Sequence, residues 1–104
     1  MIEQPVINQP ILLVEDEPDT AALVTLILQE KGYPVVHAAD GEDALNKIAS
    51  MPPPSLVLLD IQLPHVDGVT ILETIRAASD WQDVPVVLLT AVVDPSCIRR
   101  AVSI

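Results

Sequence analysis

A repeated switch from short apolar runs to longer amphipathic stretches constrains this sequence most. The apolar runs are residues 11–14, 35–38, 56–59 and 84–89. Most of them are continuous rather than alternating, which is typical of strands covered on both faces. Pro85 is compatible with the last run because it stands near the start of the strand. The runs therefore predict four short strands of a buried sheet.

The stretches between these runs predict helices. In the first, apolar residues recur at helical spacing from Leu23 to Leu28. Pro18 suits the first turn of this helix, where its missing N–H costs little, and Gly32 suits its end. Asp40 is predicted to be the N-cap of a second helix, which the three prolines at 52–54 stop.

A third helix is predicted from about residue 69 to 78, and a fourth begins at Asp94, with Pro95 at its first position. The predicted order is therefore β-α-β-α-β-α-β-α. Strands that alternate with helices predict an α/β fold, here a doubly wound parallel sheet with helices on both faces. Residues 1–9 are predicted to be a short leader, and residues 10–104 a single domain.

Composition narrows the classes of function. The chain of 104 residues has a formal net charge of −10, which disfavours direct binding to nucleic acid or to an anionic membrane surface. No run approaches the roughly 20 apolar residues of a membrane span. A single cysteine, Cys97, excludes an intrachain disulfide and suits a reducing cytoplasm. His37 and His65 have no further ligand spaced to complete a zinc site, so both are interpreted as ordinary structural residues.

Polar residues follow three of the four predicted strands. Glu15 and Asp16 follow the first, Asp60 the third and Thr90 the fourth. Ligands of open parallel sheets bind outside the carboxyl ends of the strands, and right-handed crossovers bring these ends to one edge. Clustered carboxylates repel one another unless a cation joins them, and hard oxygen ligands select Mg²⁺, Mn²⁺ or Ca²⁺. A carboxylate beside such a cation can attack phosphorus.

Each of these residues also has an ordinary structural explanation. Asp16 or Asp19 could cap the first helix, Asp60 could begin a turn, and Thr90 could satisfy a loop. The recurrence of acidic residues at the same end of the sheet favours the functional interpretation over these separate explanations.

The chain resembles a response-regulator receiver domain, the phosphoacceptor module of two-component signalling. The resemblance rests on Glu15-Asp16 after the first strand, on Asp60 after the third, and on Thr90-Ala91 after the fourth. Pro64 and Gly68 also have the family's spacing from the aspartate, Asp-x-x-x-Pro-x-x-x-Gly. The resemblance covers nearly all of the chain after Gln9. It implies a flavodoxin-like sheet in the order 2-1-3-4, with the family's fifth strand missing.

The resemblance also implies a role for each matching position. Asp60 would accept a phosphoryl group from the phosphohistidine of a histidine kinase or histidine phosphotransfer protein. Asp16 would bind Mg²⁺ directly, Glu15 through water, and Gln62 through its backbone carbonyl. The Thr90 hydroxyl and the Ala91 N–H would bond the phosphoryl group. Such a domain is not a classical enzyme, since it performs at most self-phosphotransfer and autodephosphorylation.

The sequence departs from the family pattern at its C-terminal end. The family's fifth strand, its helix and the Lys-Pro step after that strand are absent, and the only lysines are Lys31 and Lys47. We therefore expect a fragment that binds Mg²⁺ weakly and is phosphorylated poorly. Without a fifth strand the fourth becomes a sheet edge, which predicts self-association through this strand and the last helix, or marginal stability.

Two other classes of function stay open. A pseudo-receiver would use the same fold only to bind proteins. An Asp-nucleophile phosphohydrolase of the haloacid-dehalogenase type would also use Mg²⁺, but its signature needs an acid two residues after the nucleophile, where this chain has Gln62.

Overall fold

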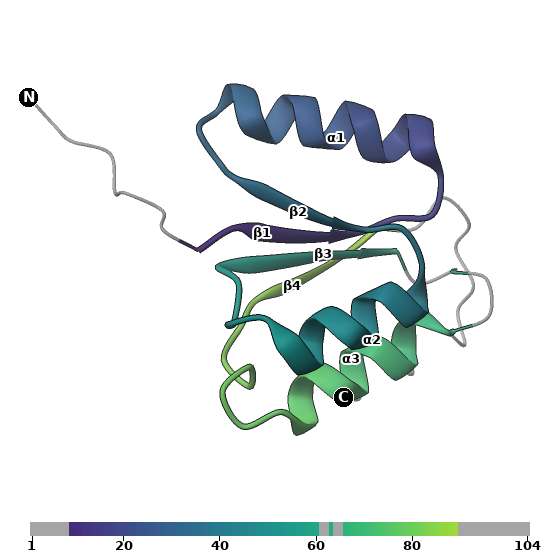
Figure 1. The fold of residues 1–104 in the computed structure, drawn as a ribbon, viewed down its shortest axis with the longest axis vertical. Coiled ribbons are helices and arrows are strands. Elements are labelled where there is room, and N and C mark those ends of the chain that lie inside the picture. Colours follow the sequence, from purple (N-terminus) through teal and green to yellow (C-terminus); the bar gives the residue numbers. More distant parts are fainter. Residues whose placement is uncertain (1–8, 61–62, 64–65, 90–104) are drawn as a thin grey trace, which may run out of the picture.

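Four parallel strands form the centre of the molecule. A computed structural model describes residues 9–60, 63 and 66–89. In chain order the elements are β1 (Ile11–Val14), α1 (Pro18–Glu30), β2 (Val35–Ala38), α2 (Gly41–Ser50), β3 (Leu56–Asp60), α3 (Gly68–Ala77) and β4 (Val86–Leu89). The sheet order is β2-β1-β3-β4, with α1 on one face and α2 and α3 on the other (Figure 1). The predicted doubly wound fold is confirmed, and the predicted helix from Asp94 lies outside the described residues.

The strands begin and end close to their predicted positions. β4 starts at Val86, two residues later than predicted, because both backbone polar groups of Val84 are bonded within the preceding turn. The Val84 N–H donates to the Trp81 carbonyl at 3.1 Å, and Pro85 has no N–H. The Arg76 guanidinium donates to the carbonyl oxygens of Gln82 and Val84, each at 2.9 Å, which fixes the turn before the strand.

The helix ends follow simple capping chemistry. The N-cap of α1 is Glu17, whose carboxylate accepts from the Asp19 N–H at 3.1 Å. Asp16 therefore does not cap α1, although capping was one structural explanation for this residue. Asp40 caps α2 as predicted, accepting from the Asp43 N–H at 2.8 Å. Gly32 follows α1 with a φ of +90°, a conformation that glycine adopts without steric cost.

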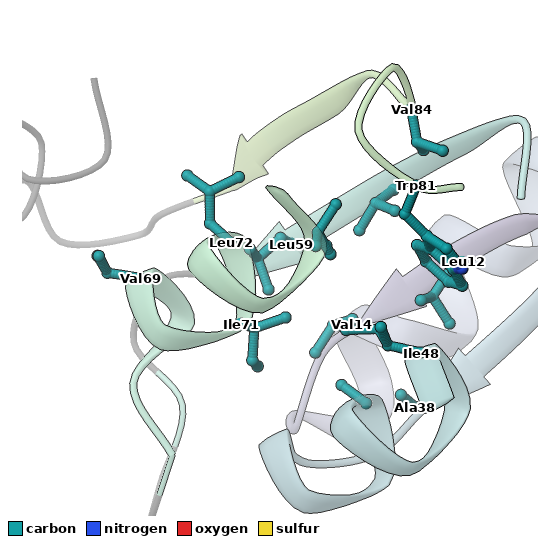
Figure 2. Close-up of a cluster of buried hydrophobic side chains, with 13 residues drawn as sticks. Leu12, Val14, Ala38, Ile48, Leu59, Val69, Ile71, Leu72, Trp81 and Val84 are labelled. Atoms are coloured by element: carbon teal, nitrogen blue, oxygen red, sulfur yellow. The ribbon is translucent and has the colours of Figure 1, made fainter. Parts of the chain in front are cut away.

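The main core lies between the sheet and the helices α2 and α3. Its buried side chains come from alternate strand positions and from both helices (Figure 2). Trp81, only 1% exposed, enters this core from the connection between α3 and β4 and points toward Leu12 (Figure 2). β1 is buried along its whole length, as the continuous apolar run predicted. This packing fixes the strand ends that carry the acidic residues.

Some apolar side chains are exposed on α1 and on β4. Leu23, Leu26 and Ile27 of α1 are each about half exposed, as is Val87 of β4. Within the described part of the chain, β4 pairs only with β3 and so forms an edge of the sheet. Self-association through this strand stays a prediction.

Candidate functional site

The strand register brings three acidic residues together. β1 and β3 are neighbours, and Val14 pairs with Leu59, so Glu15 and Asp60 follow at the same level of the sheet. One carboxylate oxygen from each of Glu15, Asp16 and Asp60 lies within 4.8 Å of the others. The predicted convergence at the carboxyl edge is confirmed for these three residues, which we call the acidic cluster.

The backbone of Glu15 is held by β2. Its N–H donates to the Ala38 carbonyl at 3.1 Å, and its carbonyl accepts from Nε2 of His37 at 2.8 Å. The side chain is nearly buried, and its carboxylate accepts from the Glu17 N–H at 3.1 Å. Asp16, the next residue, is exposed. The side chain of Glu15 is thus held in place, whereas that of Asp16 faces solvent.

Asp60 is the last residue of β3 and pairs with Leu89 of β4, so it belongs to the sheet rather than to a turn. The loop after it reaches α3 through Asp67, whose carboxylate caps that helix by accepting from the Val69 N–H at 2.8 Å. In that loop, Val66 packs directly against Gly41, the first residue of α2. The other predicted site residues, Gln62, Thr90 and Ala91, lie outside the described residues.

Electrostatics of the acidic cluster favour a bound cation. Burial raises the pKa of Glu15 above its ordinary value of 4.5, and the negative charges of Asp60 and Asp16 raise that pKa further. The hydrogen bond from Glu17 acts in the opposite direction but does not reverse the shift. A divalent cation among the three carboxylates would remove this repulsion. Three hard oxygen donors, one of them on the exposed Asp16, fit Mg²⁺, because this ion binds one or two carboxylates and keeps several waters.

The raised pKa of Glu15 predicts a pH dependence of stability in the absence of metal. The folded protein holds this proton more tightly than the unfolded chain, so the contribution of Glu15 to stability falls as the pH rises from 4.5 through the folded-state pKa. Glu15→Gln keeps the acceptor for Glu17 and removes the charge. We expect its stability relative to wild type to increase through that window and then level off, as measured by urea unfolding in chelator. A difference that stays constant with pH would contradict the shift.

Comparison with known proteins identifies the family of this chain. The model of the response regulator receiver domain family matches residues 11–104. The chain belongs to this family. The acidic cluster therefore stands at the strand ends of a receiver domain of two-component systems.

Curated relatives are longer than this receiver domain. The DNA-binding response regulator MtrA of Mycolicibacterium smegmatis is 38% identical over 87 residues, which are 84% of this chain and 36% of MtrA. The alkaline phosphatase synthesis transcriptional regulatory protein PhoP of Bacillus subtilis is 38% identical over 84 residues, which are 81% of this chain and 34% of PhoP. The chain thus spans about a third of the length of these relatives.

Solved receiver structures are similar in fold. The receiver domain of a Pseudomonas aeruginosa sensor histidine kinase, with a magnesium ion in its active site cleft, has a TM-score of 0.81 and 32% identity. That match covers 91% of this chain and 77% of the other. The response regulator TrrA of Thermotoga maritima, in complex with Mg²⁺ and BeF, has a TM-score of 0.73 and 39% identity, covering 81% and 70%.

Two features of the site were not predicted from the sequence. The bond from His37 to the Glu15 carbonyl depends on the register of β2 beside β1, and the capping role of Glu17 depends on where α1 begins. No local motif marks either of them. Among the helices of the described residues, none is both long enough and apolar enough to cross a membrane.

Proposed function

We propose that this receiver domain accepts a phosphoryl group on Asp60 from a histidine kinase or a histidine phosphotransfer protein, in the cytoplasm and with Mg²⁺. The observation that carries the proposal is the convergence of Glu15, Asp16 and Asp60 within 4.8 Å. We assign residues 10–104 to the receiver unit and residues 1–9 to a leader. DNA binding, which the name of MtrA states for that protein, is not assigned to this domain.

Each residue of the proposed site has a distinct task. Asp16 would hold the cation directly and Glu15 would hold it through water, and the backbone carbonyl of Gln62 would be a further ligand. When bound there, Mg²⁺ would offset negative charge on the transferring group. A carboxylate oxygen of Asp60 forms the new P–O bond as the P–N bond to the donor imidazole breaks, and the imidazole leaves. The Thr90 hydroxyl and the Ala91 N–H donate to phosphoryl oxygens.

One observation favours a pseudo-receiver as the second candidate. The lysines of this chain are Lys31, at the C-cap of α1, and Lys47, which pairs with Asp43 at 2.7 Å. Arg76 is bonded to the turn before β4. Within the described residues, each of these cations is thus placed away from the acidic cluster. We therefore expect partial rather than stoichiometric phosphorylation.

We also propose that the domain self-associates through β4, whichever of the two candidate functions it has.

A small-molecule phosphodonor with Mg²⁺ distinguishes the candidates. We expect a mass increase of one phosphoryl group in a fraction of the chains and slow release of free phosphate. Rapid catalytic turnover of phosphate esters would instead indicate a hydrolase. Absence of both labelling and turnover would indicate a module that only binds proteins.

A further inference from the structure

We propose that His37 is a positioning residue for the cation site, acting through the backbone of Glu15. Nε2 of His37 lies 2.8 Å from the carbonyl oxygen of Glu15. That carbonyl belongs to the peptide bond between Glu15 and Asp16, the two residues that supply acidic groups from the β1–α1 loop. This inference rests on the proposed Mg²⁺-dependent function and adds a residue to its machinery.

The hydrogen bond from His37 extends the pairing of β1 with β2 beyond the strands. The regular register ends with Val14 beside Ala38, and the Glu15 N–H still donates to the Ala38 carbonyl at 3.1 Å. In a regular parallel ladder, the Glu15 carbonyl would next accept from a backbone N–H of the neighbouring strand. β2 has ended there, and Asp40 already caps α2. The His37 ring supplies a donor to this carbonyl instead.

The protonation of the ring follows from its partner. A carbonyl oxygen only accepts hydrogen bonds, so Nε2 must carry the proton. Both the neutral form with hydrogen on Nε2 and the doubly protonated form satisfy this requirement. The positioning role therefore does not depend on the charge of His37.

The ring also lies beside the start of α1. His37 lines a shallow groove together with Pro18, Ala21 and Ala22 of that helix. Its ring is thus placed where β2, the acidic loop and the first turn of α1 meet. Holding the Glu15–Asp16 peptide plane fixes the direction in which the exposed Asp16 side chain leaves the loop. A flexible loop would have to be ordered when the cation binds, at a cost in affinity.

A purely structural hydrogen bond would have a different signature. It would contribute to the stability of the fold and nothing to the affinity for Mg²⁺. Ser55 provides the matched control, since its hydroxyl donates to the Pro10 carbonyl at 3.3 Å at the opposite end of the sheet. Ser55→Ala also deletes a bond from a side chain to a backbone carbonyl, and it leaves the acidic cluster untouched.

Calorimetric titration of the full chain with MgCl₂ tests the proposal. We expect His37→Ala to weaken Mg²⁺ binding by about tenfold, within the range seen for residues that orient metal ligands. His37→Gln, whose amide can donate, is expected to recover most of the affinity. His37→Phe keeps a ring in the groove without a donor and should bind as weakly as His37→Ala. Ser55→Ala should bind like wild type. Without Mg²⁺, hydrogen exchange at the Asp16 amide should be faster in His37→Ala and His37→Phe.

The outcomes separate this inference from the proposed function. Wild-type affinity in His37→Phe, or in His37→Ala, overturns the positioning role and leaves the proposed cation site intact. Equal weakening in Ser55→Ala also overturns it, because the effect would then be one of general stability. Failure of the wild-type chain to bind Mg²⁺ overturns the proposed function, and the positioning role with it.

Discussion

Asp16→Asn is expected to weaken Mg²⁺ binding by roughly 100-fold or more, because changes to groups that only orient metal ligands already cost 10–100-fold. Asp16 is the exposed member of the acidic cluster, and the proposed site gives it the direct bond to the cation. An amide keeps the shape of the side chain but lacks the charge that Mg²⁺ prefers. Calorimetric titration with MgCl₂ measures the change.

The same substitution has an opposite expected effect on the metal-free protein. Asp16→Asn removes one of three neighbouring negative charges, so the free energy of unfolding in chelator should rise. Lost affinity together with gained stability cannot result from partial unfolding. Glu73→Gln is the matched control, since it removes one charge from an exposed position on α3. Mg²⁺ affinity that is unchanged in Asp16→Asn, or equally reduced in Glu73→Gln, would contradict the assignment.

Gly41→Ala is expected to destabilise the fold by about 1–3 kcal/mol through overpacking. A Cβ at this position would collide with Cβ of Val66 and approach its Cγ atoms to 3.0 and 3.2 Å. Without this neighbour, alanine would be favoured over glycine in a helix. The sign of the effect therefore reports the contact between α2 and the loop after Asp60. Urea unfolding of the metal-free chain measures it.

A double-mutant cycle isolates the contact of Gly41 with Val66. In a Val66→Gly background the colliding side chain is gone, so Gly41→Ala should become neutral or stabilising. Val66→Ala retains the colliding Cβ and should not relieve the cost. Asn46→Ala, at an exposed position on α2, controls for helix propensity. Equal costs of Gly41→Ala in the wild-type and Val66→Gly backgrounds would show that the contact is not responsible.

Much of the fold was predictable because its signals are local. Continuous apolar runs marked the strands, and the capping positions of Asp40 and Gly32 marked helix ends. The start of one strand and the cap of one helix were not predicted. β4 starts at Val86 because the turn before it is bonded to Trp81 and Arg76, which no local pattern indicates. The cap of α1 is Glu17, a role that was not predicted for this residue.

The acidic cluster could be predicted because topology alone brings it together. Parallel neighbouring strands place Glu15 and Asp60 at one edge, whatever their side chains do. The raised pKa of Glu15 could not be predicted, since it depends on burial that only the packed structure provides. The bond from His37 was likewise missed, because an exposed histidine in a strand has no sequence signal for the carbonyl it contacts.

The central claim is that Asp60 accepts the phosphoryl group in a Mg²⁺-dependent reaction. Intact mass measured after incubation with a small-molecule phosphodonor tests it most directly, with wild type and Asp60→Asn compared in Mg²⁺ and in chelator. We predict the mass of one phosphoryl group on a fraction of wild-type chains in Mg²⁺ only, and on none of the Asp60→Asn chains. Equal labelling of Asp60→Asn, or wild-type labelling that is unaffected by chelator, would contradict the account.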